Sequence, residues 1–342
     1  MPVTMRDVAR RAGVSIKTVS RVVNNQGEIS EATRQRVLKA IEELGYRPNA
    51  LARGLVSGKT LTVALIIPQI TDPFFPEVVL GVESVARKHG YSVFLCNTNE
   101  DPQQELAYVE VLASKQVDGI ILCGSRLNAD QLSKVASLHR VSILTSRKPR
   151  SAAVVSIPGE AGLYEITSHL IRLGHKKIGH IGWWTEDESE RLDGYRRALR
   201  EHGIEGNERW VMRLPQVSIE NAHRAARQLL ERASEITAIS CYNDLVAIGV
   251  LQACKELGRR VPVDLAVVGF DDIPLASLVT PALTTMRVPR YELGRMVMEL
   301  LLRVIEADGD YEERLYVQPQ LVIRESCGAQ RDATSDSTIE GR

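Results

Sequence analysis

The sequence predicts an α/β protein in which a small helical N-terminal part precedes two parallel-sheet units. Three observations lead to this fold class. In the first 45 residues, apolar side chains recur at helical spacing between capping residues. From about residue 60, short apolar runs alternate with helical stretches, and this series occurs twice. The chain of 342 residues is too long for one ordinary core, so two or three folding units are expected.

Residues 4–24 (TMRDVARRAGVSIKTVSRVVN) are predicted to form two short helices joined by a tight turn. Thr4 and Asp7 have the spacing of a capping box, Gly13 ends the first helix, and Ser15 is expected to cap the second. The buried side of the second helix consists of Val19, Val22 and Val23. Its other side carries Ile16, Lys17, Ser20 and Arg21. Such a face suits a helix that reads the major groove of DNA, although an ordinary helix pair with a solvated face is the alternative.

A third helix is expected over residues 30–44, with Ser30 as its cap and Gly45 just past its end. Residues 50–56 can form only a short helix, so its order should depend on a partner. Residues 1–60 contain eleven Lys or Arg and five Asp or Glu, a net charge of +6 in a chain that is neutral overall. This asymmetry predicts that nucleic-acid affinity is confined to the N-terminal end.

The segment VSIKTVSRVVN, followed by LGYRPNALARGL, resembles the DNA-binding headpiece and hinge helix of the lactose and galactose repressor (LacI/GalR) family of bacterial transcription regulators. The resemblance extends to about residue 326. It implies that base edges are read by Ile16, Lys17 and Arg21, and that phosphates are held by Thr4, Ser15, Ser20 and Asn24. Leu55 would be the wedge that enters the minor groove. Glu28 departs from the pattern, because some members place a DNA-contacting histidine there.

The first series of predicted strands covers residues 61–67, 91–96, 119–123, 141–145 and 153–157, with helices near 76–89, 102–115 and 129–138. The second series has strands at 177–182, 236–240 and 265–270, with helices near 159–173, 190–203, 218–232 and 244–257. The resemblance implies that the two units form the bilobed core that this family shares with periplasmic sugar-binding proteins. In that fold, part of 286–318 returns to the first lobe.

We therefore expect four segments. Residues 1–48 form a helix-turn-helix headpiece, 49–59 a hinge helix and linker, 60–330 an effector-binding and dimerisation core, and 331–342 a disordered tail. Within the core, the first lobe is expected at about 60–158 and 286–318, and the second at about 159–285 and 319–330. The last four residues match a protease recognition sequence, so part of the tail is expected to derive from an expression vector.

Ligands of open parallel sheets bind beyond the carboxyl ends of the strands, so residues that follow the predicted strands are candidates for a ligand site. These residues are Asp72, Phe74, Phe75, Trp183, Thr185, Asp187, Arg191, Asn243 and Asp271. Planar polar groups that grip hydroxyls and rings that cover C–H faces are what a polyol needs. The resemblance implies that these residues line the effector cleft, with Arg191 and Asp271 as the strongest contacts.

Alternatives remain for several of these positions. Arg191 could pair with a nearby acid instead, and the candidates are Asp187, Glu188 and Glu190. Asp271 could cap a turn. The Trp183–Trp184 pair could pack between the lobes or stack on a ligand. Thr185 stands where purine-binding members of the family carry an arginine, which favours a sugar over a purine.

Other classes of site lack their motifs. The five cysteines have no metal-binding or redox spacing, the seven histidines form no HExxH motif, and no catalytic constellation or complete phosphate loop is present. We therefore expect no catalysis, no metal and no cofactor. The chain begins without a signal-like segment and contains no apolar run near 18 residues, which predicts a cytoplasmic protein without membrane contact.

Together these features predict a ligand-responsive, sequence-specific DNA-binding transcription regulator, a repressor. A small molecule, a sugar or sugar derivative, would bind between the lobes, and a homodimer would recognise a near-palindromic operator. Residues 291–305 are candidates for the dimer interface, with core packing as the alternative. The solute-binding protein of a sugar transporter would explain the core alone, but it would need a secretion signal. A sugar-modifying enzyme would need a catalytic constellation.

Overall fold

A computed structural model describes residues 3–23, 27–46, 59–184, 189–307 and 309–329. Its contacts divide the chain into two compact units, Met1–Thr62 and Val63–Arg342. The predicted hinge helix and the tail lie outside the described residues. The predicted helices and strands within the described ranges are all present, with boundaries that differ by a few residues.

The first unit contains three helices: α1 (Met5–Ala12), α2 (Ile16–Val23) and α3 (Glu31–Leu44). The predicted caps are confirmed. The carboxylate of Asp7 accepts the Thr4 backbone N–H at 3.0 Å, and the hydroxyl of Ser15 accepts the Thr18 N–H at 3.1 Å. Both Gly13 and Gly45 adopt the left-handed conformation that ends a helix. The helices bury an apolar core that is fully enclosed at Val8, Val19 and Val37.

The first lobe of the second unit is built on a six-stranded sheet with the order β11-β5-β4-β3-β1-β2. Its strands are β1 (Thr62–Ile67), β2 (Ser92–Asn97), β3 (Gly119–Cys123), β4 (Val141–Leu144), β5 (Ala153–Ser156) and β11 (Glu313–Tyr316). The pairs β1–β3, β3–β4, β4–β5 and β5–β11 are parallel. The covering helices are α5 (Phe75–Lys88), α6 (Pro102–Ser114), α7 (Ala129–Leu138) and α12 (Arg290–Glu306).

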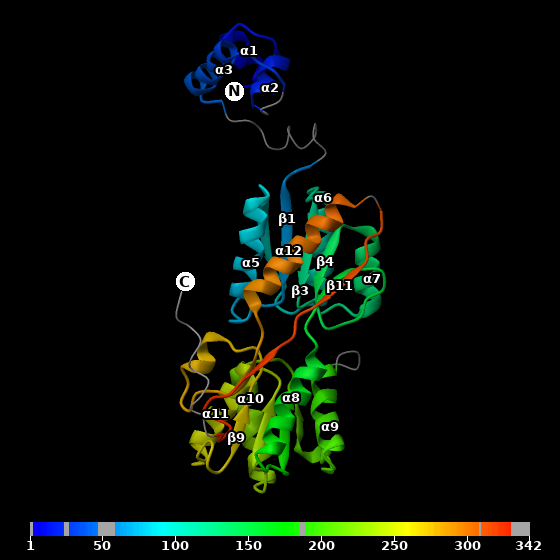
Figure 1. The fold of residues 1–342 in the computed structure, drawn as a ribbon, viewed down its shortest axis with the longest axis vertical. Coiled ribbons are helices and arrows are strands. Elements are labelled where there is room, and N and C mark those ends of the chain that lie inside the picture. Colours follow the sequence, from blue (N-terminus) through cyan, green and yellow to red (C-terminus); the bar gives the residue numbers. More distant parts are fainter. Residues whose placement is uncertain (1–2, 24–26, 47–58, 185–188, 308, 330–342) are drawn as a thin grey trace, which may run out of the picture. The chain divides into compact units, whose positions relative to one another are not determined.

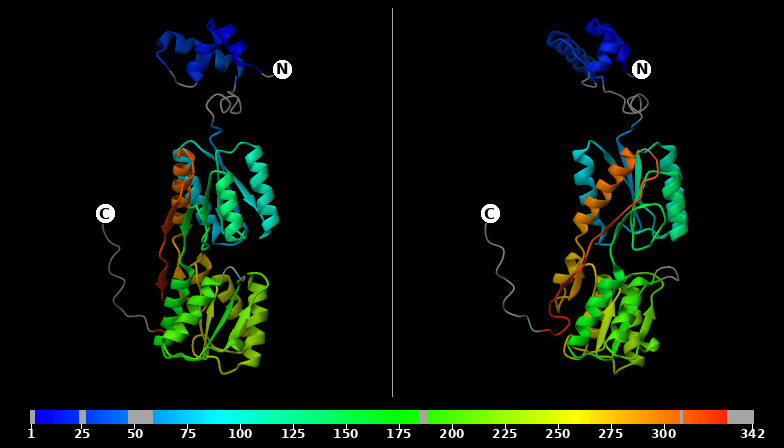
Figure 2. Two further views of the ribbon diagram at one scale, coloured as in Figure 1. Left: turned by 90° about the vertical axis from the view of Figure 1, so that its right-hand side faces the viewer. Right: turned by 45° about the vertical axis from the view of Figure 1, so that its right-hand side comes forward.

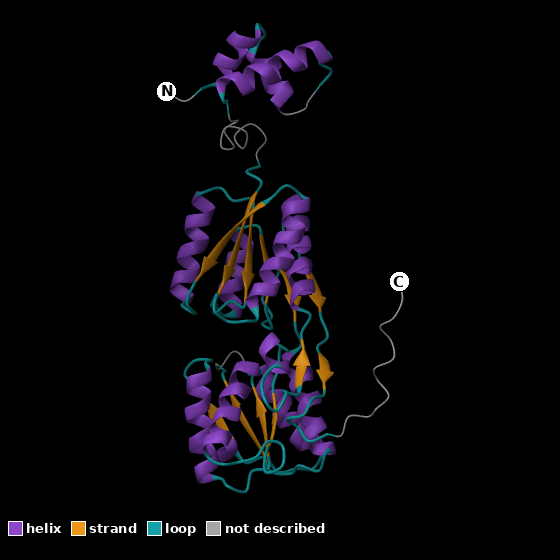
Figure 3. Ribbon diagram, turned by 90° about the vertical axis from the view of Figure 1, so that its left-hand side faces the viewer, coloured by secondary structure: helices purple, strands orange, loops and turns teal. Residues whose placement is uncertain are grey.

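Alternation along β1 explains why helices cover both faces of this sheet. Val63 and Leu65 belong to the apolar cluster that includes α5 and α12, whereas Ala64 and Ile66 belong to the cluster with α6 and α7. Figure 3 shows helices on both sides of the strands. The apolar residues of α12 are largely buried in this core. For these residues the alternative of core packing therefore applies, and not the dimer interface.

The second lobe repeats the pattern around a four-stranded parallel sheet with the order β7-β6-β8-β9. Its strands are β6 (Ile178–Gly182), β7 (Val211–Arg213), β8 (Ala238–Cys241) and β9 (Ala266–Val268). The helices that cover it are α8 (Gly159–Arg172), α9 (Glu190–Glu201), α10 (Ile219–Arg232) and α11 (Asp244–Glu256). Helices α8 and α9 pack together, as do α10 and α11. In both lobes the strands run so that the carboxyl ends of the sheet face the space between the lobes (Figures 1 and 2).

Four strands were not predicted: β7, β10 (Thr285–Arg287), β11 and β12 (Gln320–Val322). Strands β10 and β12 pair antiparallel, with Thr285 opposite Val322, where the chain passes between the lobes. Strands of three or four residues are too short to show an alternating pattern. All five cysteines are free, and all except the half-buried Cys96 are buried.

Candidate functional site

The face of α2 that was predicted to read DNA is exposed in the first unit. Lys17 and Arg21 are exposed and Ile16 is 45% exposed, while Val19 and Val22 on the opposite side are buried and Val23 is half-buried. Ser20 is half-buried. One apolar and two basic side chains therefore project from a helix whose other face is fixed in the core.

The predicted phosphate contacts lie at the beginnings of the two helices. Thr4 and Ser15 are exposed N-terminal residues whose side chains also take part in the caps of α1 and α2. Backbone N–H groups at such helix starts favour an anion. Asn24 and Leu55 lie outside the described residues.

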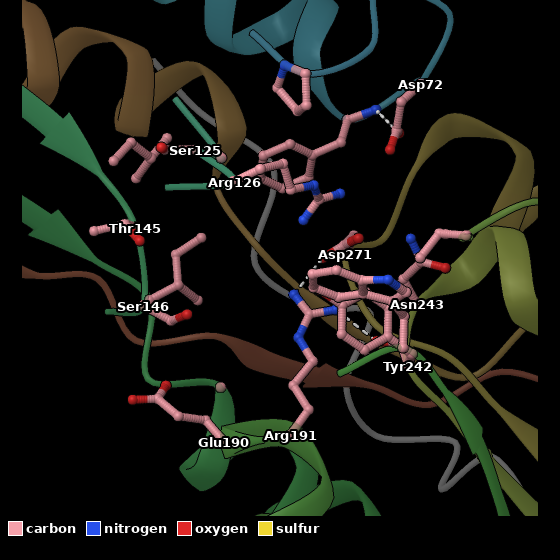
Figure 4. Close-up of a pocket in the computed structure, with 18 of the residues that line it drawn as sticks. Asp72, Ser125, Arg126, Thr145, Ser146, Glu190, Arg191, Tyr242, Asn243 and Asp271 are labelled. Atoms are coloured by element: carbon pink, nitrogen blue, oxygen red, sulfur yellow. Dashed lines mark hydrogen bonds and ion pairs between the residues drawn. The ribbon is translucent and has the colours of Figure 1, made fainter. Parts of the chain in front are cut away.

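The second unit contains a cleft between its lobes, with an empty volume of about 1070 Å³ that is partly open to solvent. We call it the interlobe cleft. Its lining comes from the carboxyl ends of strands in both lobes, as Figure 4 shows. The structure places here seven of the nine predicted effector residues: Asp72, Phe74, Phe75, Trp183, Arg191, Asn243 and Asp271. The other two, Thr185 and Asp187, lie outside the described residues.

Arg191 is fixed by contacts with three strand-end residues. Its Nη2 lies 3.3 Å from Oδ1 of Asp271, and its Nη1 donates to the backbone carbonyl of Tyr242. The guanidinium carbon lies 4.3 Å from the ring centre of Tyr242 and 4.1 Å from that of Phe270. Arg191 therefore pairs with Asp271, which is 80 residues away in the sequence, and presents a pre-oriented guanidinium to the cleft.

Asp271 is held in an unusual backbone conformation. Its φ is +107° and that of Asp272 is +52°, values that L side chains rarely adopt. The buried guanidinium of Arg290 accounts for this, because it donates to the backbone carbonyls of Asp271 at 2.6 Å and of Asp272 at 2.7 Å. The same guanidinium reaches Glu77 of α5 at 2.8 Å. Strained residues held by such contacts are typical of functional sites.

Burial raises the pKa of Asp271 to about 7, against the lowering effect of Arg191. The carboxylate of Asp72, which belongs to the first lobe, raises that pKa further. Burial also raises the pKa of Asp72, whose Oδ1 accepts the backbone N–H of Phe74 at 2.9 Å. Two carboxyl groups from opposite lobes therefore face one cleft, and burial favours the protonated form of each.

The aromatic residues and Asn243 complete the walls. The rings of Phe74 and Phe75 meet edge to face, with centroids 5.3 Å apart. Asn243 caps α11, since its Oδ1 accepts the Val246 N–H at 3.1 Å.

The two tryptophans have different positions. Trp183 lines the cleft, with the ring of Tyr242 at its edge. Trp184 packs against the apolar core, and its ring centre lies 6.3 Å from that of His180.

An ion pair in the first lobe was not predicted from the sequence. Arg126 lines the cleft and its Nη2 lies 3.1 Å from Oε1 of Glu100, while its guanidinium carbon lies 4.4 Å from the Trp183 ring centre across the cleft. The backbone N–H of Arg126 is accepted by the buried Glu105 at 3.0 Å. The sequence did contain a signal for Arg126, because this residue follows the predicted strand at 119–123. Residues beyond the carboxyl ends of parallel strands are candidates for ligand contacts.

Two kinds of feature are absent from the described part of the chain. It contains no cluster of three or more His, Cys, Asp or Glu side chains able to hold a metal ion. Among those same residues, we find no helix with the length and apolarity needed to cross a bilayer.

Comparison with known proteins identifies the family. Residues 4–49 match the model for bacterial regulatory proteins of the lacI family, and residues 60–325 match that for periplasmic binding proteins and the sugar-binding domain of the LacI family. The HTH-type transcriptional repressor PurR of Photobacterium profundum is 37% identical over 329 residues, which is 94% of this chain and 98% of PurR. The repressor CytR of Escherichia coli is 36% identical, over 95% of this chain and 96% of CytR.

Solved structures of transcription regulators support the same family assignment. A complex of the transcriptional regulator CelR with cellobiose matches with a TM-score of 0.71 and 32% identity, over 95% of this chain and 99% of CelR. The lac repressor dimer bound to operator and the anti-inducer ONPF matches with a TM-score of 0.85 and 27% identity, over 96% of this chain and 100% of that one. The chain therefore belongs to the lacI family of bacterial regulatory proteins: it is a DNA-binding transcription regulator with a ligand-binding core, and neither an enzyme nor the solute-binding protein of a transporter.

Proposed function

We propose that this regulator is a homodimeric repressor of a near-palindromic operator, and that a sugar or sugar derivative in the interlobe cleft controls its operator affinity. Residues 1–48 would read the operator, 49–59 would form the hinge, and 60–330 would hold the effector and the dimer contacts. The observation that carries the proposal is that Arg191 and Asp271 are joined and aimed into a cleft whose opposite wall carries Asp72. A ligand that contacts both walls favours the lobe arrangement in which both sets of contacts are made.

The exposed face of α2 supports the DNA-binding half of the proposal. Arg21 and Lys17 would donate to base edges, and Ile16 would make an apolar contact. Thr4, Ser15 and Ser20 would hold phosphates, together with the helix starts at which the first two lie.

The edge of the first lobe supports a homodimer. Strand β2 lies at the end of the six-stranded sheet and exposes Phe94 (48%) and Leu95 (41%), and the neighbouring α5 exposes Leu80 (56%). An apolar strand at a sheet edge requires cover. A second copy of this chain fits that need, because a two-fold dimer matches a palindromic operator.

The composition of the interlobe cleft supports a sugar. Phe74 and Trp183 offer aromatic faces for C–H groups, while Asp72, Asp271 and Arg191 offer partners for hydroxyls. The cellobiose complex of CelR is consistent with this choice. Such an effector would change operator affinity by the free energy with which it distinguishes the two lobe arrangements, typically about 1–3 kcal/mol.

Selection from randomised DNA duplexes at one fixed salt concentration tests the DNA-binding half. The wild-type chain should enrich a near-palindrome. Arg21→Ala should lose preference at one base pair per half-site, by about 1–3 kcal/mol. Lys39→Ala removes the same charge from the exposed surface of α3 and should enrich the wild-type sequence. Weak binding without sequence preference, with and without pooled sugars, would contradict the proposal.

A further inference from the structure

The cationic groups of the interlobe cleft are already paired within the protein itself. Its only cationic side chains among the described lining residues are Arg126 and Arg191, and each is paired with a carboxylate of the same chain. Arg126 pairs with Glu100 at 3.1 Å and Arg191 with Asp271 at 3.3 Å. Both guanidinium groups also lie against aromatic rings, at 4.1–4.4 Å from the ring centres.

Carboxylates outnumber cations in this lining. Four acids, namely Asp72, Glu100, Glu190 and Asp271, face two arginines, which gives a formal charge of −2. Two buried side chains behind the lining contact the loop that carries Arg126. Glu105 accepts the backbone N–H of Arg126, and Arg147 donates to the backbone carbonyl of Ser125. These two buried side chains add one charge of each sign and fix the loop that carries Arg126.

From the paired arginines and the excess of carboxylates we infer that the cleft is selective for an uncharged, hydroxyl-rich effector and rejects anionic ones, such as sugar phosphates, sugar acids and nucleotides. The inference deepens the proposed function and rests on it. An anion would have to compete with Glu100 for Arg126 or with Asp271 for Arg191. Displacement would leave Glu100 or Asp271, which have side-chain exposures of 18% and 7%, without its cation.

Hydrogen-bond chemistry leads to the same ligand class. Asp72 and Asp271 come from opposite lobes, and in its ionised form each only accepts hydrogen bonds. A sugar hydroxyl can donate to either of them, so one polyol can connect the two lobes. A phosphate or carboxylate group offers only acceptors at neutral pH and would meet these oxygens with like charge. Burial raises the pKa of Asp271, and the carboxylate of Asp72 raises it further.

The test is a panel of neutral mono- and disaccharides, each paired with its uronate, aldonate or 6-phosphate counterpart, at constant ionic strength. Binding to the full chain is measured by the shift in unfolding temperature and then by titration calorimetry. We expect at least one neutral sugar to bind and its anionic counterparts to bind at least roughly tenfold more weakly.

A matched pair of variants separates the ion-pair argument from general electrostatics. Glu100→Gln releases Arg126 and should reduce the discrimination against the anionic counterpart severalfold. Glu83→Gln removes the same charge from an exposed position on α5 outside the lining and should leave the discrimination unchanged.

Three results would overturn the inference. An anionic member that binds more tightly than its neutral parent would refute it while leaving a sugar-controlled regulator in place. Equal effects of Glu100→Gln and Glu83→Gln would show that the Arg126 pair does not set the preference. Failure of every sugar in the panel, neutral and anionic, to bind would refute the proposed sugar effector itself, and the inference with it.

Discussion

Gly194 lies where helices α8 and α9 approach most closely, and its replacement by alanine should disturb both the second lobe and the effector site. A Cβ atom at Gly194 would lie 2.1 Å from the backbone carbonyl oxygen of Glu160 and 2.9 Å from the backbone nitrogen of Tyr164. Backbone atoms cannot rotate away as a side chain can. The two helices would have to separate by about 1 Å to restore an ordinary contact distance.

The expected cost follows from two opposing effects. Alanine favours a helix over glycine by about 1 kcal/mol, whereas overpacking costs about 1–3 kcal/mol and more when backbone must move. We expect a net loss of about 2 kcal/mol, or a fall in Tm of about 4–8 °C for a unit of this size. Arg191 lies one helical turn before Gly194, so the shift of α9 should also weaken its 3.3 Å pair with Asp271.

Thermal unfolding with and without a bound sugar measures both effects. Gly206→Ala is the matched control, because a Cβ there would meet only a Leu199 methyl group at 3.8 Å. Gly206→Ala should leave Tm and sugar affinity close to wild type. If Gly194→Ala unfolded at the wild-type temperature and bound sugar with wild-type affinity, the account of α8 and α9 as the support of Arg191 would be wrong.

Three further predictions concern the cleft, its connection to α5 and the dimer. The folded-state pKa of Asp271 is raised to about 7, so its protonation contributes stability that is fully present below about pH 4 and is lost as the pH rises through 7. Asp271→Asn should therefore flatten the dependence of Tm on pH between about 4 and 7, and an unchanged profile would contradict this. Arg290 contacts the backbone carbonyls of Asp271 and Asp272 and the side chain of Glu77, and a lysine cannot make all of these contacts. Calorimetry of Arg290→Lys should therefore show sugar affinity weakened by about 1–3 kcal/mol, which is a larger loss than in Glu77→Gln. Phe94→Glu should convert the dimer into a monomer in sedimentation experiments, and a stable dimer would place the interface elsewhere.

Local signals explain why the headpiece helices could be predicted from the sequence. The caps at Thr4 and Ser30 and the glycines at positions 13 and 45 act within a few residues of each helix end. The long parallel strands could be predicted because each is a compact apolar run buried on both faces. The exposure of β2 could not be predicted, because an apolar run does not reveal whether its strand lies inside a sheet or at its edge.

The cleft could be predicted in part. Strand-end positions identified Asp72 and Asn243, and the family resemblance singled out Arg191 and Asp271, which the structure joins. The pairing of Arg126 with Glu100 could not be predicted, because the two residues are 26 positions apart and meet only through the order of strands in the sheet. The different surroundings of Trp183 and Trp184 depend on the direction of the chain after β6, which no local pattern specifies.

The central claim is that a molecule bound in the interlobe cleft sets the affinity of the headpiece for its operator. The most direct measurement is operator binding, with the duplex recovered by selection, over a range of concentrations of a sugar whose affinity is known from calorimetry. The account predicts that operator affinity changes by about 5–150-fold, with a midpoint at the sugar concentration that half-fills the cleft. Identical operator affinity without sugar and at saturating sugar would contradict it.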